Sequence, residues 1–435
     1  MPGPGRLAAQ RPRPALYRAA LLGYTAPVPE RVDVAVVGAG AAGMTAAVAA
    51  ARGGASVAVL ERLPSTGKKL LATGGGRCNI SNERLAPSAF TSTDPGLVAS
   101  VLARCGAAEI RSFFEGLGLR LTTDESGRVW PATNQAASVL RVLEIELRRL
   151  RVAVETRFTV RSIAGPAGAL DVVSEDGRTV RARAVVLAAG GRSYPALGSD
   201  GSGYALATAA GHRIVPPVPS AVPLLVRVRM CHFLQGLRMR ARVESRIGGR
   251  AAQTADGELL FTQYGLSGTA VLDVSESLSV ALNRDGRDDT AVVVDFAPFV
   301  GQEELAALFR DRLAAGWAAE DLGTGILPER FSRLLARLLQ EQGYAAGTGD
   351  ERAATGRLAG LLKAREFRVQ GTRGWNEAEF TAGGVDARQV LPGTLESRLR
   401  RGLYFAGEVL DVQAGRGGYN LGWAWASGLV AGRAE

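Results

Sequence analysis

The sequence predicts an α/β fold with a Rossmann-like dinucleotide-binding domain, and three observations lead to this expectation. A short apolar run over residues 32–37 leads without a gap into the pattern G-x-G-x-x-G. An alanine-rich helical pattern over residues 41–52 follows the glycines. A second apolar run, over residues 56–60, ends at Glu61. Strand, glycine turn, helix, strand and acidic residue in this order predict a dinucleotide site.

Each glycine of this motif, and Glu61 after it, has a defined structural role in a dinucleotide site. Gly38 permits a tight turn, Gly40 lets the backbone approach a pyrophosphate, and Gly43 lets the helix pack closely on the sheet. Free N–H groups at the helix N-terminus would bind the phosphates, because the helix dipole favours negative charge there. Glu61 would accept hydrogen bonds from an adenosine ribose and would disfavour a 2′-phosphate. The motif therefore predicts FAD or NAD and not NADP.

The composition is that of a globular protein with two or three domains. The 435 residues exceed one ordinary core, and 46% of them are hydrophobic. We expect no membrane-spanning helix, because no run of about eighteen apolar residues is free of charges and glycine turns. Residues 1–30 are rich in Pro, Arg and Ala without periodicity, and are predicted to be a disordered leader.

The charged residues and the cysteines limit the binding partners, metal sites and cellular compartment that we expect for this chain. The formal net charge is +10, and almost all cations are arginine. We interpret this bias as compositional and do not expect a nucleic-acid partner, since dispersed positive charge suits small anionic ligands equally well. The three cysteines form no C-x-x-C pair, which argues against a disulfide scaffold or a metal site and favours the cytoplasm.

A glycine-rich loop follows the nucleotide motif. Residues 67–82 read GKKLLATGGGRCNISN, and the consecutive glycines remove side chains where the chain must pass close to something. Lys68, Lys69, Arg77 and Asn79 flank them and offer hydrogen-bond donors, which suits a pyrophosphate or a flavin edge. A flexible hinge is the alternative interpretation of the glycines.

The next part of the chain completes the first α/β unit. Residues 97–119 and 135–150 have helical periodicity, and short β segments follow, with a turn at Asp176-Gly177. Residues 185–189 predict a buried parallel strand that ends at Gly190, where the backbone could approach the adenosine half of a dinucleotide. We find no second G-x-G-x-x-G unit for a tightly bound nicotinamide nucleotide.

From Val215 the pattern changes. A proline-rich boundary is followed over residues 222–300 by short β-like pieces, among them ELLFTQYGLSGTAVLDVS, which predict a small antiparallel barrel or sandwich. Residues 302–364 are helical in pattern, and strands and glycines return from Arg365.

The chain closes on a second candidate cofactor segment. Residues 403–406 form a short apolar strand, Gly407 and Glu408 follow it, and a glycine pair precedes a helix expected to start near Tyr419. The N-terminus of that helix could stabilise negative charge on a reduced isoalloxazine ring. Together with the missing second Rossmann unit, this segment favours FAD over NAD.

Several motifs together resemble the YhiN/BaiN-type flavoproteins. They are GKKLLATGGGRCNISN, GRVWPATN, VVLAAGG, FTQYGLSG, EFTAGGV and GLYFAGEVLDVQAGRGGYNLGWAWASG, in that order. The family consists of FAD-dependent oxidoreductases, some named aminoacetone oxidases and others bile-acid reductases. The resemblance implies a discontinuous FAD-binding domain, residues 31–214 and 365–435, with an inserted antiparallel β-barrel at 215–300 and a small helical insert at 301–364.

The resemblance also implies the site residues. The nucleotide motif would bind the ADP half of FAD, the Arg-Cys-Asn loop would lie near the pyrophosphate and flavin, and the closing segment would hold the ribityl chain and ring. The candidate cofactor-binding residues are Gly38, Gly40, Ala41, Ala42, Gly43, Glu61, Arg62, Lys68, Gly75, Gly76, Arg77, Cys78, Asn79, Gly190, Gly407, Glu408, Gly418, Tyr419, Asn420 and Leu421.

The expected function is an FAD-dependent oxidoreductase that transfers hydride between flavin and a small organic substrate. The expected reaction is an enone-type reduction with NAD(P)H as a transient donor, and the alternative is an oxygen-dependent amine oxidase. A non-enzymatic FAD-binding protein with a basic RNA-binding surface is the alternative of another class. Tyr264, Tyr419 and Cys78 are candidate catalytic residues, whereas His212 is expected to be structural and His232 is given no role.

Overall fold

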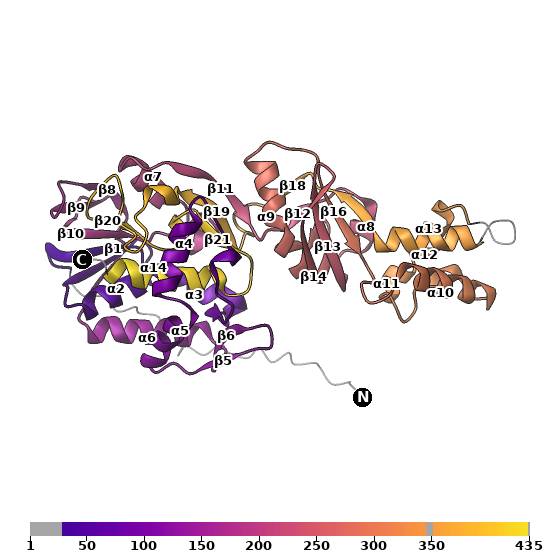
Figure 1. Cartoon of the computed structure of the whole chain (residues 1–435), viewed down its shortest axis with the longest axis horizontal. Helices are drawn as coiled ribbons and strands as arrows, with labels where there is room; N and C mark the ends of the chain where they lie inside the picture. Colours follow the sequence, from indigo (N-terminus) through magenta and orange to yellow (C-terminus); the bar gives the residue numbers. More distant parts are fainter. Residues whose placement is uncertain (1–27, 345–350, 434–435) are drawn as a thin grey trace, which may run out of the picture.

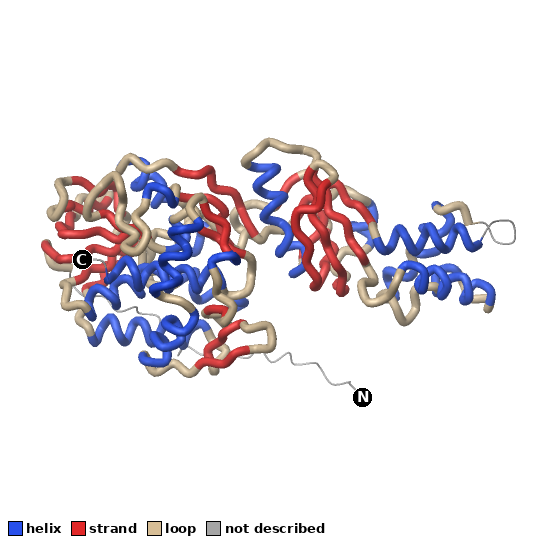
Figure 2. The backbone as a smooth tube through the Cα atoms, viewed as in Figure 1, coloured by secondary structure: helices blue, strands red, loops and turns tan. Residues whose placement is uncertain are grey.

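The computed structural model describes residues 28–344 and 351–433 of the protein (Figure 1). Residues 1–27, and with them most of the predicted leader, lie outside the described part. An α/β body occupies one end of the elongated molecule, an antiparallel sheet lies in the middle, and a group of helices forms the other end (Figures 1 and 2). None of the described helices is long and apolar enough to cross a membrane.

The α/β body is built on a seven-stranded mixed sheet. Its order is β7-β2-β1-β10-β9-β8, and β20 pairs with β10 as well. Strands β7, β2, β1, β10 and β20 run parallel, whereas β9 runs the opposite way and pairs antiparallel with both β10 and β8. The strands are β1 (Arg31–Val37), β2 (Val57–Glu61), β7 (Ala153–Thr156), β8 (Val160–Ala164), β9 (Leu170–Ser174), β10 (Thr179–Leu187) and β20 (Leu403–Phe405). The Rossmann-like α/β fold that the sequence predicts is confirmed.

Strand β10 joins the two kinds of pairing. Its first half, from Thr179, pairs antiparallel with β9, and its last residues pair parallel with β1 and β20. The buried parallel strand predicted at 185–189 is therefore the end of a longer strand, and it stops at Leu187. Because β1, β10 and β20 are parallel, their carboxyl ends meet at one edge of the sheet.

Two helices from opposite ends of the chain pack against each other beside this sheet. They are α2 (Ala41–Arg52), whose bounds agree with the prediction, and α14 (Tyr419–Arg433) (Figure 1). A Cβ on Gly428 would lie 2.4 Å from the carbonyl oxygen of Ala42, and one on Gly432 would lie 2.2 Å from that of Ala46. Only residues without side chains allow this approach.

The other helices of the body flank the sheet and carry the site loops. The segment predicted as one helix at 97–119 is two, because Cys105 and Gly106 interrupt it. The helices are α3 (Lys68–Ala72), α4 (Pro95–Arg104), α5 (Ala107–Gly116), α6 (Ala136–Arg149) and α7 (Ser202–Ala209). Short strands complete the body: β3 (Ser81–Asn82), β4 (Phe90–Ser92), β5 (Leu121–Thr123), β6 (Arg128–Pro131) and β21 (Val412–Ala414).

Helix α6 is fixed to α2 by a buried carboxylate. Glu146 is 6% exposed, and it accepts hydrogen bonds from Arg149 at 2.7 Å and from Arg52, the last residue of α2, at 3.0 Å. The bonds from Arg149, and then those from Arg52, lower the pKa of Glu146 to about 2 although burial opposes them.

Replacement of Glu146 with glutamine should therefore make stability less dependent on pH. A carboxyl whose pKa is lower in the folded state stabilises the fold above its unfolded pKa, near 4.5, and loses that contribution as the pH falls toward 2. At pH 7 we expect Glu146→Gln to lower the free energy of unfolding by about 1–2 kcal/mol, since both arginines are partly solvated. Thermal unfolding at pH 7, 4 and 3 measures the difference, and a difference that grows on acidification would contradict it.

The middle of the molecule is a second seven-stranded sheet, of order β17-β16-β13-β14-β15-β12-β18, and its pairings are antiparallel. Strands β17 and β18 are consecutive in the chain yet lie at opposite ends of this order. Between them, Val369 N–H donates to Thr290 O and Gln370 N–H donates to Leu225 O, each at 2.9 Å. The strands are β12 (Leu224–Leu225), β13 (Arg238–Ile247), β14 (Arg250–Thr262), β15 (Gly265–Ser267), β16 (Thr290–Asp295), β17 (Arg365–Arg368) and β18 (Gly371–Thr372).

The structure contradicts the prediction that all of the segment ELLFTQYGLSGTAVLDVS is β-like. Residues of the TAVLDVS segment begin a helix, α9 (Thr269–Asn283), that packs beside β13 and β14. Its buried residues Ala270, Val271, Val274 and Leu278 recur at helical spacing. A short helix, α8 (Arg229–Phe233), also follows β12 where only β-like pieces were expected.

The far end consists of helices, as the pattern of residues 302–364 indicates. They are α10 (Gln302–Ala314), α11 (Glu329–Ser332), α12 (Leu335–Glu341) and α13 (Glu351–Lys363). The α/β body and the second sheet are connected by β11 (Ile214–Ser220) and β19 (Phe380–Val385), which pair with each other. The proline-rich boundary is thus a strand, with a register shift between Val215 and Val218 that accommodates Pro216 and Pro217.

Candidate cofactor and active site

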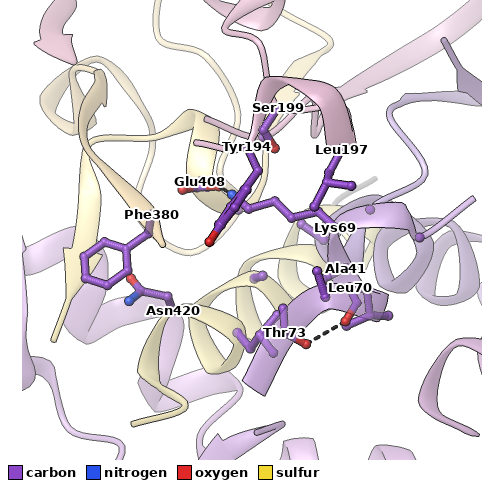
Figure 3. Close-up of a pocket in the computed structure, with 18 of the residues that line it drawn as sticks. Ala41, Lys69, Leu70, Thr73, Tyr194, Leu197, Ser199, Phe380, Glu408 and Asn420 are labelled. Carbon is purple, nitrogen blue, oxygen red and sulfur yellow. Dashed lines mark hydrogen bonds and ion pairs between the residues drawn. The ribbon is translucent and has the colours of Figure 1, made fainter. Parts of the chain in front are cut away.

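A cavity of about 690 Å³ opens at the edge of the mixed sheet where β1, β10 and β20 end. The first residues of α2 and α14 and the glycine-rich turn η1 (Thr73–Gly76) also line it (Figure 3). In an open α/β sheet, ligands bind in this crevice beyond the carboxyl ends of the strands. The three segments that the sequence singled out separately therefore surround one space.

Most of the predicted cofactor residues line this cavity. They are Gly38, Gly40, Ala41, Ala42, Glu61, Lys68, Gly75, Arg77, Asn79, Gly190, Gly407, Glu408, Gly418, Asn420 and Leu421. The candidates outside the lining are Gly43, Arg62, Gly76, Cys78 and Tyr419. Gly43 still shapes the site, because its missing side chain lets α2 approach the turn.

The glycine turn fits the pyrophosphate of a dinucleotide. A Cβ on Gly43 would lie 1.9 Å from Gly38 O, and a Cβ on Gly38 would lie 2.6 Å from Ala188 O, so both positions need glycine for packing. At Gly40 no described atom beyond its chain neighbours lies within 4 Å of such a Cβ. That space is the cavity itself, and the α2 N-terminus, which no side chain caps, faces it.

Glu61 stands at the nucleotide end with its carboxylate held by the backbone. Ala39 N–H donates to one oxygen at 2.7 Å and Leu63 N–H to the other at 2.8 Å. Burial raises the pKa of Glu61 despite these bonds. Each oxygen keeps one lone pair for a further donor, which fits the hydroxyls of an adenosine ribose.

The opposite end is formed by the loop before α14. The side chain of Asn420 is bound by the backbone of Ala414, with its Nδ2 donating to Ala414 O at 2.7 Å and its Oδ1 accepting from Ala414 N–H at 3.0 Å. Asn420 therefore fixes the loop. Asn79 Oδ1 is buried without a partner among the described residues, and a Cβ on Gly418 would lie 2.8 Å from it. An unpaired acceptor beside a helix N-terminus fits a hydrogen-bond donor of a bound flavin.

An ion pair that the sequence analysis did not single out crosses the cavity wall. Lys69 Nζ lies 2.6 Å from Glu408 Oε2 (Figure 3). It also lies 2.6 Å from Ser193 Oγ. Glu408 also accepts a hydrogen bond from Thr381 N–H at 2.8 Å. Lys68 was predicted as a ligand residue, but its neighbour makes these contacts. No local pattern could reveal a pair whose members are 339 positions apart.

A second charged group lies where the second sheet meets the body. Arg416, in the loop before α14, is 2.9 Å from Glu379 and 3.6 Å from Asp273 of α9. Burial raises the pKa of Asp273, while Arg416 opposes the rise. Arg416, Glu379 and Thr269, the first residue of α9, all line the cavity. The second sheet thus contributes to the wall through its helix.

The three candidate catalytic residues do not line the cavity. Cys78 is fully buried, and burial raises the pKa of its thiol to about 12, which favours a packing role over a reactive thiol. Tyr419 packs edge-on against Phe90. The guanidinium carbon of Arg373 lies over the ring of Tyr264, 4.7 Å from the ring centroid. His212 is buried, and its Nε2 lies 2.7 Å from Ser397 Oγ.

Among residues 28–344 and 351–433, no group of three or more His, Cys, Asp or Glu side chains is placed to hold a metal ion. Further side chains line the cavity without having been among the candidate cofactor-binding residues, including Lys69, Tyr194, Glu379, Phe380 and Arg416. All of these except Tyr194 lie in segments that the sequence analysis singled out, but only the fold shows that their side chains meet at one cavity.

Residues 32–434 match the family described as HI0933-like protein Rossmann domain. The chain is 38% identical to a 3-dehydro-bile acid delta(4,6)-reductase of Clostridium scindens, over 92% of this chain and 98% of that protein. It is 32% identical to a ribosomal RNA dihydrouridine synthase of Escherichia coli, over 92% of this chain and 96% of that protein. The fold is similar to a 3-ketosteroid delta1-dehydrogenase of Sterolibacterium denitrificans, with a TM-score of 0.51, 14% identity, and 93% and 99% of the two chains covered.

Proposed function

Because this chain belongs to the HI0933-like Rossmann family and is an FAD-dependent oxidoreductase, we propose that it reduces a carbon–carbon double bond conjugated to a carbonyl group. The observation that carries the proposal is the likeness to the delta(4,6)-reductase over nearly the whole of both chains. A dihydrouridine synthase also saturates a double bond conjugated to a carbonyl, so the names of both relatives describe one type of reaction.

The residues of the cavity suit this reaction. The N-terminus of α2 and Glu61 would hold the ADP half of FAD, and the α14 loop with Asn79 would hold the flavin end. FAD, once reduced, supplies hydride. Arg416 would place positive charge beside the carbonyl oxygen, where negative charge develops as hydride reaches the double bond.

We propose NAD(P)H as a transient donor, because the chain has no second Rossmann motif for a tightly bound nicotinamide nucleotide. Anaerobic mixing of the FAD-loaded protein with NADH and with NADPH tests this through the flavin absorbance. Bleaching by one of them is expected. Bleaching only by an amine such as aminoacetone would instead favour the oxygen-dependent amine oxidase.

The experiment that tests the reaction starts from flavin reduced anaerobically with dithionite, so it does not depend on the donor. We expect a 3-oxo-Δ4,6 steroid to restore the oxidised flavin spectrum and to gain two hydrogen atoms by mass. If neither this steroid nor a uridine-containing RNA reoxidises the flavin, the proposal is wrong.

One observation favours RNA as a second substrate candidate. Residues 31–214 contain 22 Lys and Arg against 15 Asp and Glu, whereas residues 215–364 contain 17 against 18. The positive charge is thus concentrated in the half that contributes most of the cavity, and Arg77 and Arg128 line it. A non-enzymatic RNA-binding flavoprotein would bind RNA in a salt-sensitive manner without reoxidation of flavin by RNA or steroid.

We further propose that residues 31–214 and 365–435 form the FAD-binding domain and that residues 215–300 and 301–364 are insertions, a barrel and a helical unit. The hydrogen bonds that link the segment between β17 and β18 to both Thr290 and Leu225 support closure of the second sheet into a barrel. Thr269, the first residue of α9, lines the cavity, and this supports a role for the barrel in substrate binding.

We also propose a cytoplasmic location, which the three free, buried cysteines support.

A further inference from the structure

The proposed reduction needs a proton donor. When hydride reaches the β-carbon of a conjugated carbonyl, an enolate forms, and its α-carbon must take a proton from a group within the cavity. The three residues that the sequence suggested do not line the cavity, and neither do the two histidines. The donor must therefore be sought among the side chains that the fold brings to the wall.

Tyr194 has the position that a proton donor requires. It lines the cavity, and its hydroxyl projects into the open space on the side of Phe380 and Asn420 (Figure 3). Among the described residues the hydroxyl has no hydrogen-bond partner. Phe380 supplies an apolar part of the wall on that side, and Asn420 is the second residue of α14, at the flavin end. A substrate between them would meet the tyrosine hydroxyl.

The backbone at Tyr194 is held in an unusual conformation. Its φ of 55° lies in the left-handed region, which bulky residues rarely adopt because it strains the backbone. Contacts on both sides maintain it. Tyr194 N–H donates to Trp375 O at 2.9 Å, Arg192 N–H donates to Thr381 Oγ1 at 2.8 Å, and Ser193 Oγ binds Lys69. Strain maintained by this many contacts beside a cavity indicates a functional constraint.

The other hydroxyls of the wall are less suited to this role. Thr73 Oγ1 donates to Leu70 O at 2.6 Å. Thr269 Oγ1 accepts from Glu258 N–H at 2.9 Å, and its aliphatic hydroxyl is a much weaker acid than a phenol. Ser65 follows Glu61 closely in the chain, and Ser199 follows Gly198, whose Cβ would touch Leu63. The hydroxyls of both serines, which also line the cavity, are aliphatic and likewise weaker acids than a phenol.

We propose that Tyr194 is the catalytic acid of this protein, an inference that rests on the proposed function. Its O–H bond breaks as a C–H bond forms at the α-carbon of the enolate, and solvent then returns a proton to the phenolate. The hydride and this proton together account for the two hydrogen atoms gained. Burial, and then the charges of Glu379 and Glu377, raise the pKa of Tyr194, so the phenol stays protonated at neutral pH.

The test is Tyr194→Phe, with Tyr204→Phe as the matched control. Tyr204, on α7, also has a buried hydroxyl without a partner among the described residues, but it does not line the cavity. We expect both variants to bind FAD and to melt as the wild type does. After anaerobic reduction with dithionite, Tyr194→Phe should be reoxidised by a 3-oxo-Δ4,6 steroid about 10²–10⁴-fold more slowly, and Tyr204→Phe at the wild-type rate.

Two further measurements distinguish an acid from a structural residue. The wild-type rate should fall at a pH above the ordinary tyrosine pKa of about 10, and Tyr194→Phe should lose this dependence. In D₂O the wild type should place deuterium at the α-carbon with a solvent isotope effect that the variant changes. Reoxidation of Tyr194→Phe at the wild-type rate would overturn the inference alone. Failure of the wild type with both the steroid and the RNA would overturn the proposed function and this inference with it.

Discussion

A protein with Gly40 replaced by alanine is expected to fold and to bind FAD about 10–100-fold more weakly than the wild type. The added methyl group would meet no described protein atom beyond its chain neighbours, so the fold tolerates it. It would instead occupy the space in which the pyrophosphate approaches the backbone. Forcing a methyl group into a filled site costs about 1–3 kcal/mol, and 1.4 kcal/mol is a tenfold change in affinity. Titration of the apoprotein with FAD, followed by flavin fluorescence, measures the loss.

Two other glycine variants separate binding from folding. In Gly43→Ala the new Cβ would lie 1.9 Å from Gly38 O, so α2 must move and both stability and FAD binding should fall. In Gly116→Ala, on α5, the Cβ would meet no described atom beyond its neighbours, away from the cavity, and neither property should fall. If Gly40→Ala binds FAD as the wild type does, the pyrophosphate does not lie at this turn.

Replacement of Gly428 with alanine should lower the free energy of unfolding by about 1–3 kcal/mol. Its Cβ would lie 2.2 Å from Thr45 Oγ1 and 2.4 Å from Ala42 O, and the backbone atom cannot move unless α2 and α14 separate. Because both helices begin at the cavity, we also expect weaker FAD binding. Thermal unfolding with and without FAD measures the two effects.

The matched control is Gly356→Ala on α13. There the Cβ would meet no described atom beyond its neighbours, and alanine stabilises a helix relative to glycine by up to about 1 kcal/mol. The control should therefore melt at the wild-type temperature or above. A Gly428→Ala variant that melts together with this control would show that the helix contact tolerates a methyl group.

Local pattern was enough to predict the first unit of the fold. The bounds of α2 agree with the prediction, and α14 begins at Tyr419 as expected. In both places, glycines directly precede a helical run. Helix α9 was missed because Thr and Val at its start have high β propensity, although its buried residues recur at helical spacing. Periodicity over the whole segment, and not the first few residues, decides its structure.

The site could be predicted only where its residues belong to a motif with fixed spacing. The glycines and Glu61 have such a spacing, because one strand–turn–helix–strand unit must contact both the pyrophosphate and the ribose. Tyr194 has none, and although Lys69 and Glu408 lie in segments that the sequence singled out, their pairing was not predicted because they are 339 positions apart in the chain. The close approach of Gly428 to α2 likewise follows from packing between chain ends, which a single sequence does not display.

The contact between α2 and α14 has a consequence for synthesis on the ribosome. The nucleotide turn is translated early, but roughly 370 residues separate the two helices, which takes about 20–70 s at 5–20 residues per second. Until α14 emerges, the groove on α2 that receives Gly428 and Gly432 stays exposed, and the flavin end of the cavity lacks its wall. We therefore expect FAD to be retained only once α14 has emerged, so nascent chains stalled before Tyr419 should not retain it.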